Sequence, residues 1–406
     1  MWETIPKKQI VRETSFFLDW LAKRVLIESN LRKSKETLLE AQRLAPEHKS
    51  LETTPQGAPW HAEGAVVARH VERILAGLFA IVDGESLLDI EEFSRHKNLH
   101  HEIEELEQII REHAATLQAF ALLHDLGKAV TVSFEAPTDS KGAAEGFFQN
   151  KYRRSEQATE TERHTYLKLV KAMQVKNPDL NEEEVMAKFY DEYEIIAHFY
   201  RHAPISAGQQ FAEAREKICD KLRLSARERR LLEFTIRHHI EVIHAFAKRP
   251  EPSKFRTYTA KANKAGFDAD DALDFMLAAL FLDTAVGSLR YEEGIFDVDL
   301  RPTVNFLLSE EMLLPQRREQ RRSKIELQKT RAFKQMLNDS GLEPEEVFKV
   351  LGTPFTAERG KIMQEIYQLI VDPDQPIDFG AQTDYLLPKI NKARSAFDES
   401  QHIVPR

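Results

Sequence analysis

The chain has 406 residues, of which 42% are hydrophobic and 30% charged, and its net charge at pH 7 is −9. Such a composition supports a globular core but gives nucleic acid no general electrostatic attraction, so binding to it would require a local basic patch. A single cysteine, Cys219, excludes an internal disulfide and a cysteine-based zinc site. Because no apolar run is long enough to span a membrane and the N-terminus lacks the apolar segment of a signal peptide, we expect a cytoplasmic protein that does not associate with membranes.

Apolar residues recur at spacings of three and four, and no segment shows sustained alternation, which predicts an all-α protein. We expect one or two helices within residues 14–43, followed by a proline-rich polar break from Ala45 to Pro59. Further helices are expected near residues 64–82, 101–126, 155–174, 181–200, 206–222, 226–247 and 270–290.

The composition also indicates how the chain divides into domains. Residues 133–200 are polar and charged and separate two parts of the candidate site, so we interpret them as an inserted helical excursion. From residue 306 onward, a basic segment leads into a smaller helical region. We therefore expect N-terminal helices over 1–50, a main helical bundle over 57–305 that contains the insertion, and a C-terminal helical region over 306–406.

The most informative motif is His-Asp-Leu-Gly-Lys at residues 124–128, which directly follows an apolar run. An aspartate buried at the end of such a helix takes up a proton unless something compensates its charge. A divalent cation provides that compensation, because it binds an ionised carboxylate and a neutral imidazole. Taken alone, the His124-Asp125 dipeptide favours the alternative of a structural pair at a helix end that a glycine terminates.

Four further segments place metal-ligand residue types among apolar residues. They contain His70, His202, the pair His238-His239, and Asp283. A single buried histidine is more often structural than a ligand, a single buried aspartate is more often a helix cap, and adjacent helical residues point about 100° apart, so that one of the paired histidines can face solvent. The combination across five helices nevertheless predicts a metal centre, because helical metalloproteins build their sites in this way. The remaining histidines are interpreted as surface residues, except that His61 and His198 are intermediate.

At this point the sequence resembles a known family. The set of His70, His124-Asp125 and Asp283 resembles the HD superfamily of metal-dependent phosphohydrolases, which have an all-helical core, over residues 57–290. The additional histidines resemble its two-metal branch.

The sequences of several short segments are most similar to the HD domain of bacterial CCA-adding enzymes and poly(A) polymerases. Residues 351–363 are weakly similar to the C-terminal region of these enzymes. This similarity is carried by Trp60-His61-Ala62-Glu63-Gly64, by Ala121 to Lys128, and by Arg237-His238-His239. The spacing from Gly64 to His70 is one residue longer than in that family. No Gly-Ser motif with paired aspartates precedes residue 57, so we do not expect nucleotide addition.

The resemblance implies a binuclear centre in which Asp125 bridges two ions. One ion would be held by His70, His124 and Asp283, and the other by His202, His238 and His239. Nitrogen and oxygen donors without thiolate suit Mn²⁺, Fe²⁺, Ni²⁺, Co²⁺ or Zn²⁺, and Mg²⁺ remains compatible. Lys128 would then supply positive charge to a phosphate oxygen; the alternative is a helix-terminal lysine that satisfies backbone carbonyls.

The expected function is that of a metal-dependent phosphohydrolase or phosphodiesterase acting on a nucleotide or on an RNA-terminal 2′,3′-cyclic or 2′-phosphate. Asp125 and Lys128 would be catalytic. The expected substrate-binding residues are Lys128, Arg237, Arg317 and Arg321. The last two belong to the basic segment 315–332, whose alternative interpretation is a solvated helix face. Two other functions stay open: an HD-fold diiron oxygenase and a non-catalytic binding module. The sequence is also compatible with a homodimer.

Overall fold

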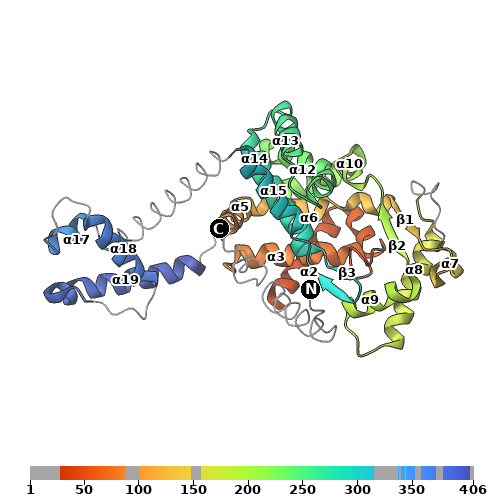
Figure 1. Ribbon diagram of the computed structural model, residues 1–406, viewed down its shortest axis with the longest axis horizontal. Helices are drawn as coiled ribbons and strands as arrows, with labels where there is room; N and C mark the ends of the chain where they lie inside the picture. Colours follow the sequence, from red (N-terminus) through yellow and green to blue (C-terminus); the bar gives the residue numbers. More distant parts are fainter. Residues whose placement is uncertain are drawn as a thin grey trace, which may run out of the picture. The chain divides into compact units, whose positions relative to one another are not determined.

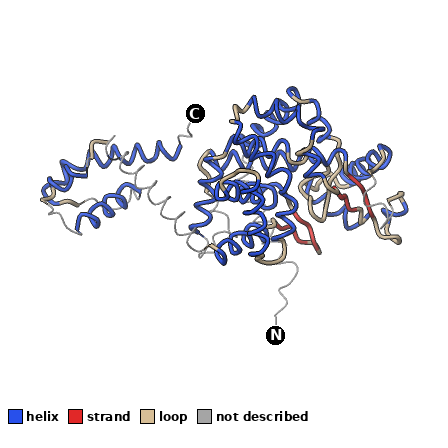
Figure 2. Tube along the Cα trace, turned by 90° about the horizontal axis from the view of Figure 1, so that it is seen from above, coloured by secondary structure: helices blue, strands red, loops and turns tan. Residues whose placement is uncertain are grey.

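The computed structural model describes residues 28–86, 100–147, 157–314, 337, 340–342, 344–352, 358–371 and 378–402. The chain forms two compact units, Met1–Leu314 and Pro315–Arg406 (Figure 1). Within the described residues the secondary structure is helical apart from two short two-stranded sheets (Figure 2). The predicted all-α fold class is therefore confirmed. No helix among these residues is both long and apolar enough to cross a membrane.

The larger unit is a helical bundle with one continuous hydrophobic core. Helices α3, α6 and α14 are buried around most of their circumference, which places them at its centre. The helices outside the insertion are α2 (Glu28–Leu44), η1 (Pro46–Glu52), α3 (Val67–Val82), α5 (His100–Glu112), α6 (Ala114–Leu123), η4 (Leu126–Val130), α10 (His202–Ser206), η5 (Gln209–Phe211), α11 (Ala212–Lys221), α12 (Ala226–Phe246), α13 (Pro252–Lys264), α14 (Ala269–Phe281), η6 (Leu282–Gly287) and α15 (Arg301–Leu313).

Two expected helices differ from those observed. The helix expected over 101–126 is two helices, α5 and α6, with His113 between them. The bundle also extends beyond the expected boundary near residue 306, because Phe306 on α15 is buried in the main core. The second unit begins at Pro315 instead.

The insertion is a small subdomain with its own hydrophobic core. Strands β1 (Val132–Glu135) and β2 (Ile196–Phe199) pair antiparallel, with Val132 opposite Phe199, and join it to the bundle. Between them lie α7 (Lys141–Ala144), α8 (Glu160–Lys176) and α9 (Glu182–Tyr193). The helix expected over 181–200 is therefore wrong at its C-terminal end, where Glu194 adopts φ 52° and the chain continues as β2.

Capping boxes explain where several helices begin. The capping residues of α8, α9 and α12 are Thr159, Asn181 and Ser225, respectively. Each side chain accepts a hydrogen bond from the backbone N–H of a glutamate three residues later. The carboxylate of that glutamate accepts a hydrogen bond from the backbone N–H of the capping residue, so two backbone donors at the start of the helix are satisfied.

Irregular backbone follows the end of α14. The chain passes through the π-helical turn η6 and then forms a hairpin of β3 (Arg290–Glu292) and β4 (Ile295–Asp297). Glu293 and Gly294 both have positive φ, as a tight hairpin turn requires.

The smaller unit contains three helices in its described part, α17 (Pro344–Val350), α18 (Glu358–Val371) and α19 (Thr383–His402), together with the short η7 (Gly380–Gln382). Its own core is formed by Leu337, Leu342, Val347, Ile366, Ile370, Leu386, Ile390 and Ala393.

Candidate metal centre

Six buried side chains from separate parts of the chain meet inside the larger unit. His70 comes from α3, His124 and Asp125 from the end of α6, and the others from α10, α12 and η6. None of the six is more than 6% exposed. The cluster consists of His70, His124, Asp125, His202, His239 and Asp283.

The first group of donors surrounds the His70 ring. Its Nε2 atom lies 3.3 Å from Nε2 of His124, 3.1 Å from Oδ1 of Asp283 and 3.6 Å from Oδ2 of Asp125. Nε2 of His124 is also 3.3 Å from the same Asp125 oxygen. Two imidazoles and two carboxylates therefore point their donor atoms at one small volume.

The second group lies on the other side of the Asp125 carboxylate. Nε2 of His202 is 3.2 Å from Oδ1 of Asp125. One donor atom each from Asp125, His202 and His239 lies within 4.8 Å of the other two. Asp125 thus presents one oxygen to each group, which is the arrangement of a carboxylate shared by two sites.

The histidine tautomers leave the inward nitrogens free. The Nδ1–H groups of His124, His202 and His239 donate to the carbonyls of Phe120, Phe199 and Ile236 at 3.1, 2.8 and 2.7 Å, respectively. A neutral imidazole with Nδ1 protonated has its lone pair on Nε2. The Nε2 atoms of His202 and His239 are buried and have no hydrogen-bond partner in the described part of the chain. Metal-ligating histidines characteristically have this geometry, so the residues fit a metal ion.

Burial and neighbouring charges shift the pKa values of the cluster residues. Burial lowers the pKa of His239 to about 3, which keeps its ring neutral. Burial also lowers the pKa of His70, but hydrogen bonds to Asp283 and Glu63 outweigh it and raise that pKa to about 9. Burial raises the pKa of Asp125, yet His124 and Lys128 hold it well below its ordinary range. The carboxylates are therefore ionised at neutral pH, as cation binding requires.

Two glycines allow the ligand-bearing elements to approach each other. A Cβ on Gly127 would lie 2.3 Å from the carbonyl oxygen of His202, and the Gly127 N–H donates to Oγ of Ser206 at 2.8 Å. A Cβ on Gly287 would lie 2.8 Å from Cε1 of His70. The glycine of the His-Asp-Leu-Gly-Lys motif therefore permits α10 to bring His202 to Asp125.

Lys128 is buried next to the cluster. Its Nζ atom lies 2.8 Å from Oδ2 of Asp125, 3.3 Å from Nε2 of His61 and 4.8 Å from the centroid of the Phe199 ring. These contacts direct the ammonium group toward the donor cluster, which favours the site interpretation over that of a lysine satisfying helix-terminal carbonyls.

Other expected site residues are not brought into the cluster. Nδ1 of His238 lies 3.1 Å from Glu241, so of the adjacent histidines only His239 faces the cluster. His238 is therefore removed from the ligand set, because the two rings point in different directions from one helix. The Arg237 side chain donates to Glu233 and to the Ala207 carbonyl. Arg317 and Arg321 lie outside the described residues.

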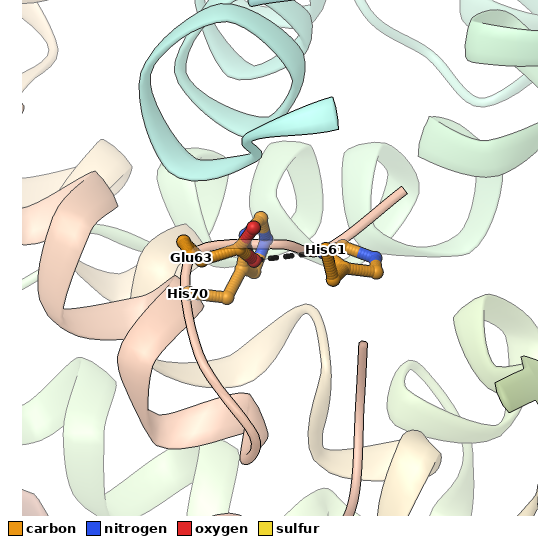
Figure 3. Close-up of side chains that lie close together, drawn as sticks. All are labelled: His61, Glu63 and His70. Carbon is orange, nitrogen blue, oxygen red and sulfur yellow. Dashed lines mark hydrogen bonds and ion pairs between the residues drawn. The ribbon is translucent and has the colours of Figure 1, made fainter. Parts of the chain in front are cut away.

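The sequence interpretation missed two residues beside the cluster. His61 and the fully buried Glu63 come from the loop before α3, and Figure 3 shows the Glu63 carboxylate next to the rings of His61 and His70. Both residues belong to the Trp60–Gly64 stretch that carried part of the family resemblance, which was the available signal. His48, interpreted as a surface residue, is also fully buried.

Comparison with known proteins finds no match among family models, curated proteins or solved structures. Functional inference therefore rests on the donor cluster itself.

Proposed function

We propose that the chain is a metal-dependent phosphohydrolase with two ions in the donor cluster. His70, His124 and Asp283 would hold one ion, His202 and His239 the other, and Asp125 would give one oxygen to each. The shared Asp125 carboxylate, with histidine donors on both sides, is the observation that carries this proposal. It agrees with the expectation from the resemblance to the HD superfamily, except that His238 is not a ligand.

When bound, two such ions lower the pKa of a water molecule toward neutrality and offset charge on the attacking and leaving oxygens of a phosphoester. The protein contributes a buried site whose carboxylates are already ionised, so that little reorganisation accompanies binding. Lys128 adds a fixed positive charge beside Asp125, where it can neutralise a phosphate oxygen.

The proposed substrates are nucleotides or RNA ends with a 2′,3′-cyclic or 2′-phosphate. Support beyond the resemblance comes from the segments next to the ligands. Trp60 precedes His61 and is 43% exposed, and Tyr200, two residues before His202, is 62% exposed. The exposed Arg201 lies between Tyr200 and His202. Exposed aromatic rings can stack on a nucleobase and an arginine can bind phosphate, so these residues suit a base-bearing phosphoester.

The test begins with metal analysis of protein purified without chelators. Hydrolysis is then measured on 2′,3′-cyclic mononucleotides, 2′-nucleotides and an RNA with a terminal cyclic phosphate, with Mn²⁺, Ni²⁺ or Co²⁺ supplied. We expect Asp125→Ala to abolish both metal binding and hydrolysis, whereas Asp139→Asn, at an exposed position of the insertion, changes neither.

Two outcomes would replace the proposal. Bound iron with O₂ consumption, and no hydrolysis of any phosphoester, would favour the diiron oxygenase. Absence of metal and of hydrolysis in the wild-type protein would favour a non-catalytic binding module.

A further inference from the structure

Glu63 is a buried carboxylate that connects separate segments around the cluster. Its Oε1 atom accepts hydrogen bonds from Nδ1–H of His61 at 2.8 Å and from Nε2–H of Gln56 at 3.1 Å, and lies 3.4 Å from Nδ1 of His70. Its Oε2 atom accepts from the backbone N–H of Leu289 at 2.9 Å. Leu289 follows η6, which carries Asp283, so Glu63 contacts two of the three segments that supply the first donor group, α3 and the segment of η6.

Each of the four described groups around the Glu63 carboxylate presents a nitrogen that can donate a hydrogen bond. An ionised carboxylate accepts at both oxygens and donates nothing, whereas an amide of the same shape would turn an N–H toward another donor. The position therefore requires a carboxylate and not merely a polar side chain of this size. Burial leaves no solvent to substitute for a lost bond.

His61 extends the contact from Glu63 to the shared ligand. Because Nδ1–H of His61 donates to Glu63, the lone pair on its Nε2 accepts from the Lys128 ammonium at 3.3 Å. Lys128 in turn contacts Oδ2 of Asp125 at 2.8 Å. Two hydrogen bonds and an ion pair thus connect Glu63 through His61 and Lys128 to Asp125, and Glu63 also lies beside Nδ1 of His70 at 3.4 Å.

We propose that Glu63 is a positioning residue with two separable tasks. Through His70 it orients a ligand of the first ion, and through His61 it holds the ammonium group of Lys128 beside the reacting phosphate. This inference rests on the proposed function. Carboxylates that bind the outer nitrogen of a ligating histidine are known to strengthen metal affinity by about 10–100-fold.

A different interpretation is that the same residues hold a third cation. His61, Glu63 and His70 each have a donor atom within 4.8 Å of the other two. Against this, Nε2 of His70 faces the first donor group, and Nδ1 of His61 is the protonated nitrogen that donates to Glu63. The two interpretations differ in metal stoichiometry, which makes them separable.

The experiment compares Glu63→Gln and His61→Ala with Glu72→Gln, a matched control on α3 whose carboxylate pairs with Arg69. Metal content, Mn²⁺ affinity, the Co²⁺ absorption spectrum and kcat are measured for each full-length variant. We expect Glu63→Gln to weaken one of two ions by about 10–100-fold and to alter the Co²⁺ spectrum. We expect His61→Ala to retain both ions and the wild-type spectrum but to lose kcat, and Glu72→Gln to resemble the wild type.

Each other outcome overturns the inference in a distinct way. Wild-type metal affinity in Glu63→Gln would show that the carboxylate is only structural. Loss of one ion in His61→Ala would establish the third cation. If Glu63→Gln does not fold, the His61→Ala arm still decides, because unchanged kcat there contradicts the role of Lys128. A wild-type protein without bound metal would overturn the proposed function together with this inference.

Discussion

Single side chains determine how many ions the cluster can hold. His202 contacts Oδ1 of Asp125 and groups with His239, whereas the His70 group faces Oδ2, so His202 adds nothing to a site built around His70. His238, next to His239 in sequence, instead contacts Glu241 and packs its ring 4.9 Å from that of Phe234. Of these adjacent histidines, His239 belongs to the donor cluster, and His238 is a control position outside it.

We predict that His202→Ala reduces bound metal from about two ions per chain toward one, because it removes a donor from the second group only. His238→Ala should leave the stoichiometry unchanged. Metal analysis after equilibration with Mn²⁺ and gel filtration measures both. Equal losses in the two variants, or a stoichiometry of one in the wild type, would contradict a two-ion centre.

Residue types and local apolar context were sufficient to predict most of the cluster. His70, His124, Asp125, His202, His239 and Asp283 were all proposed from sequence, and the structure brings them together. The choice between His238 and His239 required the helix rotation, which sequence spacing does not determine. Glu63 was missed because a charged residue in a loop before a helix is normally exposed, and only tertiary contacts bury it.

His48 provides a prediction about pH. It is buried and its Nδ1–H donates to the Ala45 carbonyl at 3.1 Å. Burial lowers its pKa in the folded protein, although bonds to the Ala45 and Leu122 backbones oppose this. The unfolded chain therefore takes up the proton first as the pH falls below about 6.5, and the free energy of unfolding decreases there by up to about 1.4 kcal/mol per pH unit.

We expect His48→Gln to remove the proton that His48 takes up on unfolding, so that the free energy of unfolding falls less steeply as the pH drops below about 6.5. Urea unfolding at several pH values, with a chelator present to remove metal, measures how steeply the free energy of unfolding depends on pH. A curve that is displaced but equally steep would show that His48 does not titrate on unfolding.

At the scale of elements, the site depends on two close approaches of backbone. Contact between α10 and η4 places the second donor group, and contact between η6 and α3 places the first. Each contact is made at a glycine where a Cβ would collide. Gly127 lies against the His202 carbonyl, and Gly287 lies against the Ile74 side chain and the His70 ring of α3.

We therefore predict that Gly127→Ala and Gly287→Ala affect different ions. Gly127→Ala displaces α10 and should weaken the ion held by His202, whereas Gly287→Ala displaces Asp283 from His70 and should weaken the other. Each should also lower the free energy of unfolding by about 1–3 kcal/mol, as overpacking usually does. Mn²⁺ titrations of both variants serve as mutual controls. Loss of the same ion in both would contradict this assignment.

Element type was easier to predict than element ends. The spacing of apolar residues identified α3, α12 and α14, whose buried faces make this signal strong. It did not reveal β2, because this strand has four residues and is stabilised by pairing with β1 across the whole insertion. Short strands formed by distant pairing leave little local pattern, so tertiary contacts decide them.

At the scale of the whole molecule, the cluster joins segments that are far apart in sequence. Its ligands extend from residue 70 to residue 283 and come from α3, the end of α6, α10, α12 and η6, all in the larger unit. An ion that binds only the folded state stabilises it by about 2.7 kcal/mol when its free concentration is 100 times Kd. The smaller unit has a separate hydrophobic core, and none of its described residues belongs to this cluster.

The expected consequence is two thermal transitions that respond differently to metal. Mn²⁺ at about 100 times Kd should raise the Tm of the larger unit by roughly 4 °C for each ion, because a unit that extends from Met1 to Leu314 gains about 1.5 °C per kcal/mol. Addition of a chelator should reverse the rise, and the transition of the smaller unit should stay fixed because all residues of the donor cluster lie in the larger unit. Calorimetry of the full chain measures both, with Asp125→Ala as the control in which neither transition responds. A single transition that shifts as one, or a shift that persists in Asp125→Ala, would show that the stabilising ion binds elsewhere.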